Sequence, residues 1–224
     1  MQPKIAVILP CHNEVVTIAD VVTQFKIALP HAKIFVYDNN STDGTDHAAK
    51  KAGATVCYEP LQGKGNVVRR MFSDIEADIF IMADGDGTYD ATVAPMLVKT
   101  LHEEKLDMVV GARPHSSENG QYRTGHQIGN RILTWFVAVI FGRDLKDMLS
   151  GYRVFSRKFV KSFPALSKGF EIETELTIHS LHLQLPMLEV ETKYSARPDG
   201  SASKLSTWRD GLRILWTILL LFKD

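Results

Sequence analysis

The sequence predicts an α/β protein with a mostly parallel β-sheet flanked by helices. Short apolar runs of strand length alternate with amphipathic helical stretches through the first half of the chain, which is the pattern of consecutive strand–helix–strand units. Polar or charged residues follow four of these runs, as expected where parallel strands end at a common edge. With 224 residues, 45% of them hydrophobic and 23% charged, the chain fits one large domain or one domain with an appendage.

The first half of the chain is expected to contain these alternating elements in order. A helix over Val15–Leu29 would place Val21, Val22 and Phe25 on one face, and the loop Asn39–Gly44 supplies N-cap residues for the next helix. The expected strands are Ile5–Leu9, Ile34–Tyr37, Thr55–Tyr58, Ile79–Ala83 and Met108–Gly111. The expected helices are Val15–Leu29, Thr45–Lys51, Asn66–Ile75 and residues 92–104.

The second half of the chain is less regular. A polar loop over Pro114–Gly125 precedes an apolar helix over Gln127–Phe141. Tyr152–Phe155 is expected to form a short strand, and Glu171–Leu183 a helix. Met187–Tyr194 alternates apolar and polar residues, which is typical of an edge or antiparallel strand.

Two aspartates directly follow the expected strand Ile79–Ala83. Asp84 and Asp86 are spaced i, i+2, so both side chains can reach one ligand, and the glycines beside Asp86 leave room for a large one. Two carboxylates this close repel each other unless a proton or a cation lies between them. Mg²⁺ or Mn²⁺ completed by substrate phosphates fits this arrangement. An ordinary turn is the alternative; an EF-hand is excluded, because Tyr89 and Pro95 stand where it needs Gly and Glu.

The same edge of the sheet should gather polar residues from several strand ends. These are Pro10, Asn13 and Glu14 after the first strand, Asp38 after the second, Asp84 and Asp86 after the fourth and Arg113 after the fifth. An aspartate such as Asp38 is often only a turn former, but the end of the second strand is also where a ribose or a base is commonly held. The sequence therefore predicts one ligand site built from separate segments.

Charge and cysteine content exclude other classes of protein. A formal net charge of zero argues against a nucleic-acid-binding protein. The two cysteines, Cys11 and Cys57, provide neither a disulfide framework nor zinc-site spacing. The run Ile5–Leu9 is too short for a signal peptide, so a cytoplasmic location is expected. The apolar runs Ile132–Gly142 and Ile214–Phe222 are each about half the roughly 20 residues that span a bilayer, and the second suggests a chain that stops short of a membrane segment.

Eight short segments, in this order and spacing, cover nearly the whole chain. They are Val7–Glu14, Asp38–Thr45, Gly63–Asn66, Asp84–Asp86, Gly111–Arg113, Ser150–Arg153, Gly169–Glu173 and Arg197–Lys204. Together they resemble the GT-A glycosyltransferases of family 2, and within that family the polyprenyl-phosphate branch, similar to dolichol-phosphate mannose synthase. The resemblance implies a GT-A fold with a Rossmann-like sheet, and transfer of a hexose from a nucleotide-diphosphate sugar, linked to uridine or guanosine, onto polyprenyl phosphate.

The resemblance also implies roles for individual residues. Asp84 and Asp86 would hold Mg²⁺ or Mn²⁺ on the donor's pyrophosphate. Arg197 and Lys204 would lie in a C-terminal loop that closes over the phosphates and neutralises the leaving diphosphate; an ordinary solvated turn is the alternative. The implied donor-binding residues are Pro10, Asn13, Glu14, Asp38, Lys64, Asp84, Asp86, Arg197, Ser203 and Lys204.

The acceptor determines whether a general base is needed. A lipid monophosphate has a second pKa of about 6, so it is largely ionised at neutral pH and attacks without one. Its charge must be neutralised instead, and Arg113, Arg123 and Arg131 are expected to do so. Glu171 and Glu173 match the region where relatives with hydroxyl acceptors carry their base, and here they are expected to orient other groups. The implied catalytic residues are Asp86, Arg113, Glu171, Glu173 and Lys204, acting in one inverting displacement without a covalent intermediate.

The resemblance places the protein at the cytoplasmic face of a membrane, either peripheral or anchored. Trp208–Trp216 mixes aromatic, aliphatic and basic residues as interfacial helices do, and Trp135 and Phe136 lie in a second such stretch. Packing of both helices in the core is the alternative. Residues 1–205 are expected to form the catalytic domain, and residues 206–224 an amphipathic helix leading toward a membrane segment.

Two other functions remain open at this point. A family 2 enzyme with a sugar or other hydroxyl acceptor would depend strictly on Glu171 or Glu173. A non-catalytic module would bind the sugar nucleotide with metal and show no turnover. The complete set of acidic residues and Lys204 argue against the second alternative.

Overall fold

The computed structural model describes residues 3–114, 124–201 and 207–223 and contains one seven-stranded sheet within them. The sheet has the order β3-β2-β1-β4-β6-β5-β7. Its strands are β1 (Ile5–Cys11), β2 (Lys33–Asp38), β3 (Thr55–Tyr58), β4 (Ile79–Met82), β5 (Met108–Ala112), β6 (Arg153–Ser156) and β7 (Met187–Glu191). Strand β6 runs antiparallel to its neighbours β4 and β5, whereas the other neighbouring pairs are parallel. The predicted mostly parallel sheet is confirmed.

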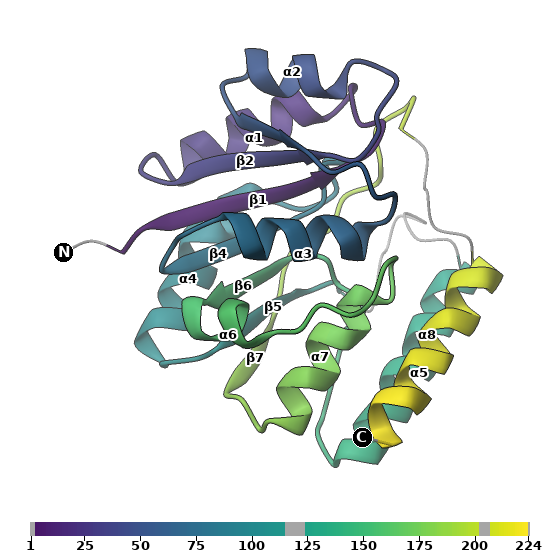
Figure 1. Cartoon of the computed structure of the whole chain (residues 1–224). Helices are drawn as coiled ribbons and strands as arrows, with labels where there is room; N and C mark the ends of the chain where they lie inside the picture. Colours follow the sequence, from purple (N-terminus) through teal and green to yellow (C-terminus); the bar gives the residue numbers. More distant parts are fainter. Residues whose placement is uncertain (1–2, 115–123, 202–206, 224) are drawn as a thin grey trace.

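Helices cover both faces of this sheet (Figure 1). They are α1 (Ile18–Ala28), α2 (Thr45–Lys51), α3 (Lys64–Asp74), α4 (Ala94–Glu103) after the 3₁₀ turn η1 (Ala91–Val93), α5 (Thr124–Phe141), α6 (Arg157–Ser162), α7 (Ile172–His182) and α8 (Thr207–Lys223). Successive side chains of a strand point to opposite faces, so Val7 and Leu9 of β1 pack with α1, while Ala6 and Ile8 pack with α3 and α7.

In the second half, one expectation is confirmed and another needs correction. The segment expected to be an edge or antiparallel strand is an edge strand, but β7 pairs in parallel with β5, and the antiparallel strand is β6. The cause is the crossover through α7, which returns the chain in the direction of β5. The polar loop expected over Pro114–Gly125 ends earlier, because α5 begins at Thr124. Helix α6 was not expected from the sequence.

Helices α5 and α8 lie side by side at one end of the molecule and contact each other, and α8 also contacts α7 (Figure 1). Val137 of α5, Ile214 and Ile218 of α8 and Ile178 of α7 form a separate apolar cluster. One face of α8 is therefore packed against the protein. The proposed boundary between residues 205 and 206 lies outside the described residues. Across the described part of the chain, no helix is both long and apolar enough to cross a membrane.

Candidate active site

Four acidic residues converge at the carboxyl ends of β1, β2 and β4. Strand β1 lies between the other two, and Cys11 at its end is in register with Asp38. Burial raises the pKa of the Cys11 thiol, and the carboxylates of Glu14, Asp84, Asp38 and Asp86 raise it further. All four carboxylates thus lie near Cys11, at the end of the strand that stands between β2 and β4.

Asp38 has an oxygen that can accept a hydrogen bond from a ligand. Its Oδ2 accepts from the backbone N–H of Ser41 at 3.2 Å, while Oδ1 is buried and has no hydrogen-bond partner among the described residues. A buried carboxylate oxygen without a partner costs free energy, which a bound N–H or O–H group would recover. The position suits the predicted contact with a nucleoside.

Asn13 and Glu14 connect the end of β1 to neighbouring segments. The Asn13 Oδ1 accepts from Thr42 N at 2.8 Å, so this side chain fixes the loop before α2. Glu14 is buried, and its Oε2 accepts a hydrogen bond from Ser201 Oγ at 3.3 Å. The predicted donor-binding residue Glu14 thus contacts a segment from the far end of the chain.

Lys64 reaches the site because the start of α3 packs closely on residues 167–168. At Gly63 the backbone φ is +129°, and a Cβ there would lie only 2.2 Å from the carbonyl oxygen of Lys168, so glycine is required. The Lys64 ammonium then forms ion pairs with Asp84 and, at 2.5 Å, with Glu173 Oε1. Burial alone would lower the pKa of Lys64, but Asp84 and Glu173 outweigh it and keep the ammonium charged.

Asp86 is held more tightly than Asp84. Its Oδ1 accepts from Thr88 N at 3.1 Å and from Thr88 Oγ1 at 2.7 Å, and its Oδ2 pairs with Arg197 Nη2 at 2.6 Å. The described residues contain no cluster of three or more His, Cys, Asp or Glu suited to a metal ion. Mg²⁺ or Mn²⁺ needs only one or two carboxylates when phosphates complete its shell, so Asp84 and Asp86 fit such an ion.

The two candidate glutamates have different surroundings. Glu173 is buried against Lys64; burial, together with the charge of Asp84, raises its pKa despite Lys64. Glu171 accepts from the backbone N–H groups of Lys168 and Gly169 through Oε1, and its Oε2 is buried with no partner among the described residues.

Arg113 is already engaged in a buried ion pair. Its guanidinium donates to Asp147 through Nε at 2.6 Å and Nη2 at 2.7 Å, and it lies 5.6 Å from the centre of the Tyr194 ring. Burial would lower the pKa of Arg113, but Asp147 outweighs it. The Arg113 guanidinium is therefore shared with Asp147, and any contact with the acceptor would have to be made beside this ion pair. Arg123, Ser203 and Lys204, and the side chain of Arg131, lie outside the described residues.

Sequence reasoning missed two residues that shape the site. Asp147 orients Arg113, but a single aspartate in an irregular region gives no signal. Arg153 is fully buried and donates to the carbonyl oxygens of Ser150 and Glu173 at 2.8 and 3.1 Å. It thereby ties the loop before β6 to the first turn of α7, and its place in the Ser150–Arg153 motif was the available signal.

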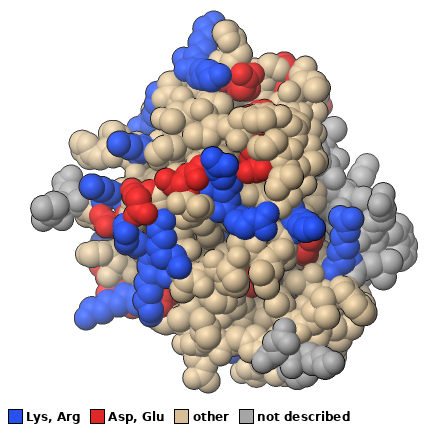
Figure 2. All heavy atoms as spheres, viewed as in Figure 1, with Lys and Arg blue, Asp and Glu red and all other residues tan. Residues whose placement is uncertain are grey.

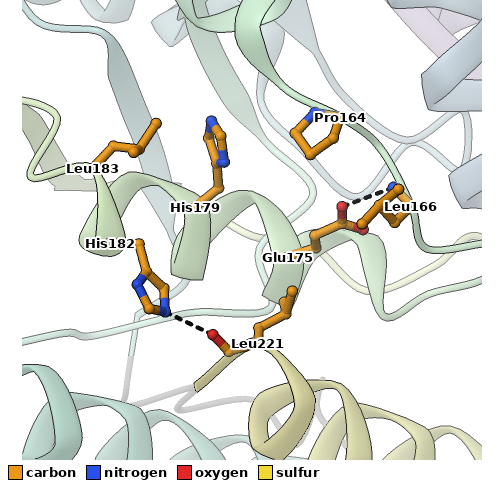
Figure 3. Close-up of a pocket in the computed structure, with 7 residues that line it drawn as sticks. All are labelled: Pro164, Leu166, Glu175, His179, His182, Leu183 and Leu221. Carbon is orange, nitrogen blue, oxygen red and sulfur yellow. Dashed lines mark hydrogen bonds between the residues drawn. The ribbon is translucent and has the colours of Figure 1, made fainter. Parts of the chain in front are cut away.

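Charged side chains of both signs are intermingled on the surface shown in Figure 2, in keeping with the net charge of zero. A separate cavity of about 150 Å³ lies along α7, from Glu175 to His182 (Figure 3). Its lining is mainly apolar, although His179 Nε2 there is buried without a partner among the described residues. The lining residues are Pro164, Leu166, Glu175, His179, His182, Leu183 and Leu221.

The fold is similar to that of crystallised enzymes. Glucosyl-3-phosphoglycerate synthase from Mycobacterium tuberculosis, in complex with phosphoglyceric acid, superposes with a TM-score of 0.80 at 23% identity, over 99% of this chain and 80% of that one. A second crystal structure of the same synthase, with Mn²⁺, UDP and phosphoglyceric acid, gives a TM-score of 0.79 at 22% identity, over 98% and 78%. At this identity the likeness establishes the fold, and the predicted GT-A architecture is confirmed.

Sequence relatives are more similar. The chain is 56% identical to protein RfbJ of Shigella flexneri over 124 residues, which is 55% of this chain and 96% of RfbJ. It is 39% identical to glycosyltransferase AglJ of Haloferax volcanii over 92% of this chain and 68% of AglJ. It is 31% identical to the low-salt glycan biosynthesis hexosyltransferase Agl6 of the same organism over 94% of this chain and 52% of Agl6.

The family model described as glycosyl transferase family 2 matches residues 6–163, which include β1 to β4, the paired aspartates and the buried Arg153. That match covers well over half of the chain, and it includes three of the strand ends at which the acidic residues meet. The protein therefore belongs to glycosyl transferase family 2 and is a glycosyltransferase acting on a nucleotide sugar.

Proposed function

We propose that this enzyme transfers a hexose from a nucleotide-diphosphate sugar to polyprenyl phosphate at the cytoplasmic face of a membrane. The observation that carries the acceptor assignment is the ion pair between Glu173 and Lys64. The Glu173 Oε1 is engaged by the buried Lys64 ammonium, so Glu173 serves Lys64 as a counter-ion although burial raises its pKa. An ionised phosphate acceptor needs no proton transfer to a carboxylate.

The donor half of the proposal rests on Asp38, Asp84 and Asp86. The buried, unpartnered Oδ1 of Asp38 suits a donor group of the nucleoside. Asp84 and Asp86 would hold Mg²⁺ or Mn²⁺, which neutralises charge on the leaving diphosphate when bound. The Mycobacterium tuberculosis synthase of the same fold has been crystallised with Mn²⁺ and UDP, in agreement with the predicted cofactor.

The chain's own cations support the departure of the diphosphate. Lys64 stays charged and fixes Asp84 in place, and Arg197 lies beside Asp86 where the donor phosphates would approach. With the leaving group held on one side, attack by the phosphate oxygen on the opposite face of the anomeric carbon forms the new bond as the old one breaks. The product is then inverted at the anomeric carbon.

The membrane part of the proposal is supported by apolar side chains on the outward faces of α5 and α8. These helices pack together through Val137, Ile214 and Ile218, yet each exposes a tryptophan that is 64% accessible. Exposed apolar groups on adjoining helices are typical of interaction surfaces, and tryptophan favours the lipid–water interface. The exposed residues are Ile132, Trp135, Val139, Leu215, Trp216, Leu219 and Leu220.

A transfer assay with a matched acceptor tests this function. The enzyme is incubated with Mn²⁺, radiolabelled UDP- or GDP-hexoses and a short polyprenyl phosphate, and the label in the organic phase is counted. One donor should give a lipid product with the phosphate, and the corresponding polyprenol, which lacks only the phosphate, should give none. Equal transfer to the polyprenol, or transfer only to a soluble sugar, contradicts the proposed acceptor.

A hydroxyl acceptor is the second candidate, and Glu171 is the observation in its favour. The Glu171 Oε2 is buried without a partner among the described residues, so it could accept a proton from a bound hydroxyl. On this alternative, Glu171→Gln abolishes turnover on the soluble acceptor.

A further inference from the structure

Residues 194–201, which we name the strap, cross the donor site. At one end Tyr194 packs edge-on against Tyr89 with ring centres 5.4 Å apart, and Ser195 N donates to Thr88 O at 2.9 Å. At the other end Ser201 Oγ donates to Glu14 Oε2 at 3.3 Å. The strap thus spans from the segment after β4 to the end of β1, the two borders of the proposed donor site.

Between these ends, Arg197 forms an ion pair with Asp86, one of the two carboxylates proposed to hold the metal. The Asp86 side chain is only 3% exposed, and its Oδ1 is taken by the two hydrogen bonds from Thr88. The remaining oxygen, Oδ2, forms an ion pair with Arg197 Nη2 at 2.6 Å. A divalent cation approaching Oδ2 would meet a positive charge at contact distance, so both cannot bind this oxygen together.

We infer that Arg197 competes with the divalent metal for Asp86, and that the donor's diphosphate relieves this competition by drawing Arg197 onto its phosphates. The inference rests on the proposed metal-dependent donor site and describes how that site is controlled. Metal and nucleotide would then bind cooperatively, since each binds best when the other has helped to remove Arg197 from Asp86. By linkage, the enhancement is the same in both directions.

The local charges fit this exchange. Asp84, Asp86 and Glu173 are ion-paired with Lys64 or Arg197, so these five side chains together carry one net negative charge while Arg197 is in place, and Glu14 and Asp38 add to it. Departure of Arg197 leaves two negative charges on the other four side chains, which match one divalent cation. Lys64 is the fixed member of the pair, because its side chain is 9% exposed and is held by two carboxylates, whereas that of Arg197 is 29% exposed.

Mn²⁺ binding to the intact protein tests the inference without an activity measurement. Free Mn²⁺ is titrated by electron paramagnetic resonance against wild type, Arg197→Gln and Arg197→Lys, each with and without UDP or GDP. Lys193→Gln is the control, since it removes an exposed positive charge next to the strap. Thermal melting and circular dichroism confirm that every variant is folded.

In Arg197→Gln, the nucleotide-free protein should bind Mn²⁺ about 5-fold or more tightly than wild type, and the enhancement of Mn²⁺ affinity by nucleotide should shrink by a similar factor. Arg197→Lys should lie between the two, and Lys193→Gln should match wild type. Unchanged or weaker Mn²⁺ binding by Arg197→Gln, with nucleotide enhancement intact, overturns the inference and leaves the donor site standing. Absence of Mn²⁺ and nucleotide binding in all proteins overturns the proposed function and the inference with it.

Discussion

Asp84 and Asp86 have the same proposed role as metal ligands but differ in how the protein holds them. Asp84 is 27% exposed at its side chain and is tied to Lys64, whereas Asp86 is buried and fixed by Thr88. The hydrogen bonds from Thr88 fill one oxygen of Asp86 and leave the other for a cation. Each carboxylate therefore has its own cation, Lys64 for Asp84 and Arg197 for Asp86.

Asp84→Asn and Asp86→Asn should each remove metal-dependent binding of the donor while the protein stays folded. The amide keeps a hydrogen-bond acceptor for Thr88 but loses the charge that attracts the metal. Thermal melting with UDP- and GDP-sugars, with and without Mn²⁺, measures this, because ligand at 100 times Kd stabilises the folded state by about 2.7 kcal/mol. Asp90→Asn is the matched control, since Asp90 caps η1 by accepting from Thr92. Unchanged metal-dependent stabilisation in either variant would place the metal elsewhere.

Lys204→Ala should lower kcat far more than it raises the Kd of the donor. Negative charge on the diphosphate grows as it leaves, so a positioned cation stabilises the transition state more than the ground state. Loss of such a group costs roughly 10²–10³-fold in kcat in comparable cases. A rise in KM with unchanged kcat would show that Lys204 contributes only to binding.

At the residue scale, the sequence predicted the convergence of acidic residues but not their partners. Parallel strands end at one edge, so the positions of Asp38, Asp84 and Asp86 followed from the order of the elements. The partner of Arg113 did not, since Asp147 lies 34 residues away across an irregular region. No local pattern specifies which of several acidic residues closes such a distance.

At the element scale, the loop before β6 is held by two buried cations. Arg113 binds Asp147 by two parallel hydrogen bonds, and Arg153 binds the carbonyl oxygens of Met148 and Ser150. Gly151 in this loop lies against Asp84, where a Cβ would be 2.8 Å from Oδ2. The loop thus packs directly against the Asp84 side chain and limits its position.

Asp147→Asn should lower the free energy of unfolding by about 3 kcal/mol, because breaking a buried ion pair leaves the Arg113 charge without compensation. Burial tends to raise the pKa of Asp147, but Arg113 lowers it below its ordinary value of 3.8 overall. The stabilisation from Asp147 is therefore complete above pH 3.8 and is lost as the pH falls through the lower folded-state pKa. Urea unfolding across this range should show a shallower decline in Asp147→Asn than in wild type.

The exposed Asp144→Asn serves as control for that measurement. If Asp147→Asn is as stable as wild type at neutral pH, the ion pair contributes nothing to the stability of the loop.

The same buried pair complicates Arg113→Ala as a test of acceptor binding, because loss of Arg113 leaves the buried Asp147 carboxylate without its cation. Arg123→Ala and Arg131→Ala are the cleaner tests of the predicted acceptor-phosphate contacts.

Elements of the first half were predictable because each forms from consecutive residues with a regular period. The strand β1 follows a continuous apolar run of strand length, and the helix α1 follows apolar residues that repeat every third to fourth position. The parallel pairing of β7 with β5 depends on the crossover through α7, and period-two alternation alone does not distinguish parallel from antiparallel neighbours.

At the scale of the whole molecule, the chain combines a donor site with exposed apolar faces on α5 and α8. Its described residues contain no helix that could span a membrane. The sequence predicted amphipathic helices but left their surroundings open between lipid and core. The structure has one face of each packed and another exposed. Periodicity gives the two faces of a helix, whereas only the packing of distant segments determines which is covered.

Trp135→Glu together with Trp216→Glu should reduce binding to anionic lipid vesicles by about 10-fold or more, since each change replaces an exposed apolar group with a charge that the lipid disfavours. Flotation of the protein with vesicles measures the bound fraction. Ile27→Glu is the matched control, because Ile27 is 75% exposed on α1 rather than on α5 or α8. Wild-type protein that stays in the lipid-free fraction would contradict the membrane contact.

The central claim is that an ionised phosphate attacks the sugar without a general base, and turnover of glutamate variants tests it most directly. Transfer of radiolabelled hexose to a short polyprenyl phosphate is measured for wild type, Glu171→Gln and Glu173→Gln, with each rate divided by the folded fraction. A positioned general base contributes roughly 10²–10⁴-fold, so both variants should keep turnover within about 10-fold of wild type. A loss of 100-fold or more in either folded variant would contradict the claim, because it would show that attack depends on that carboxylate.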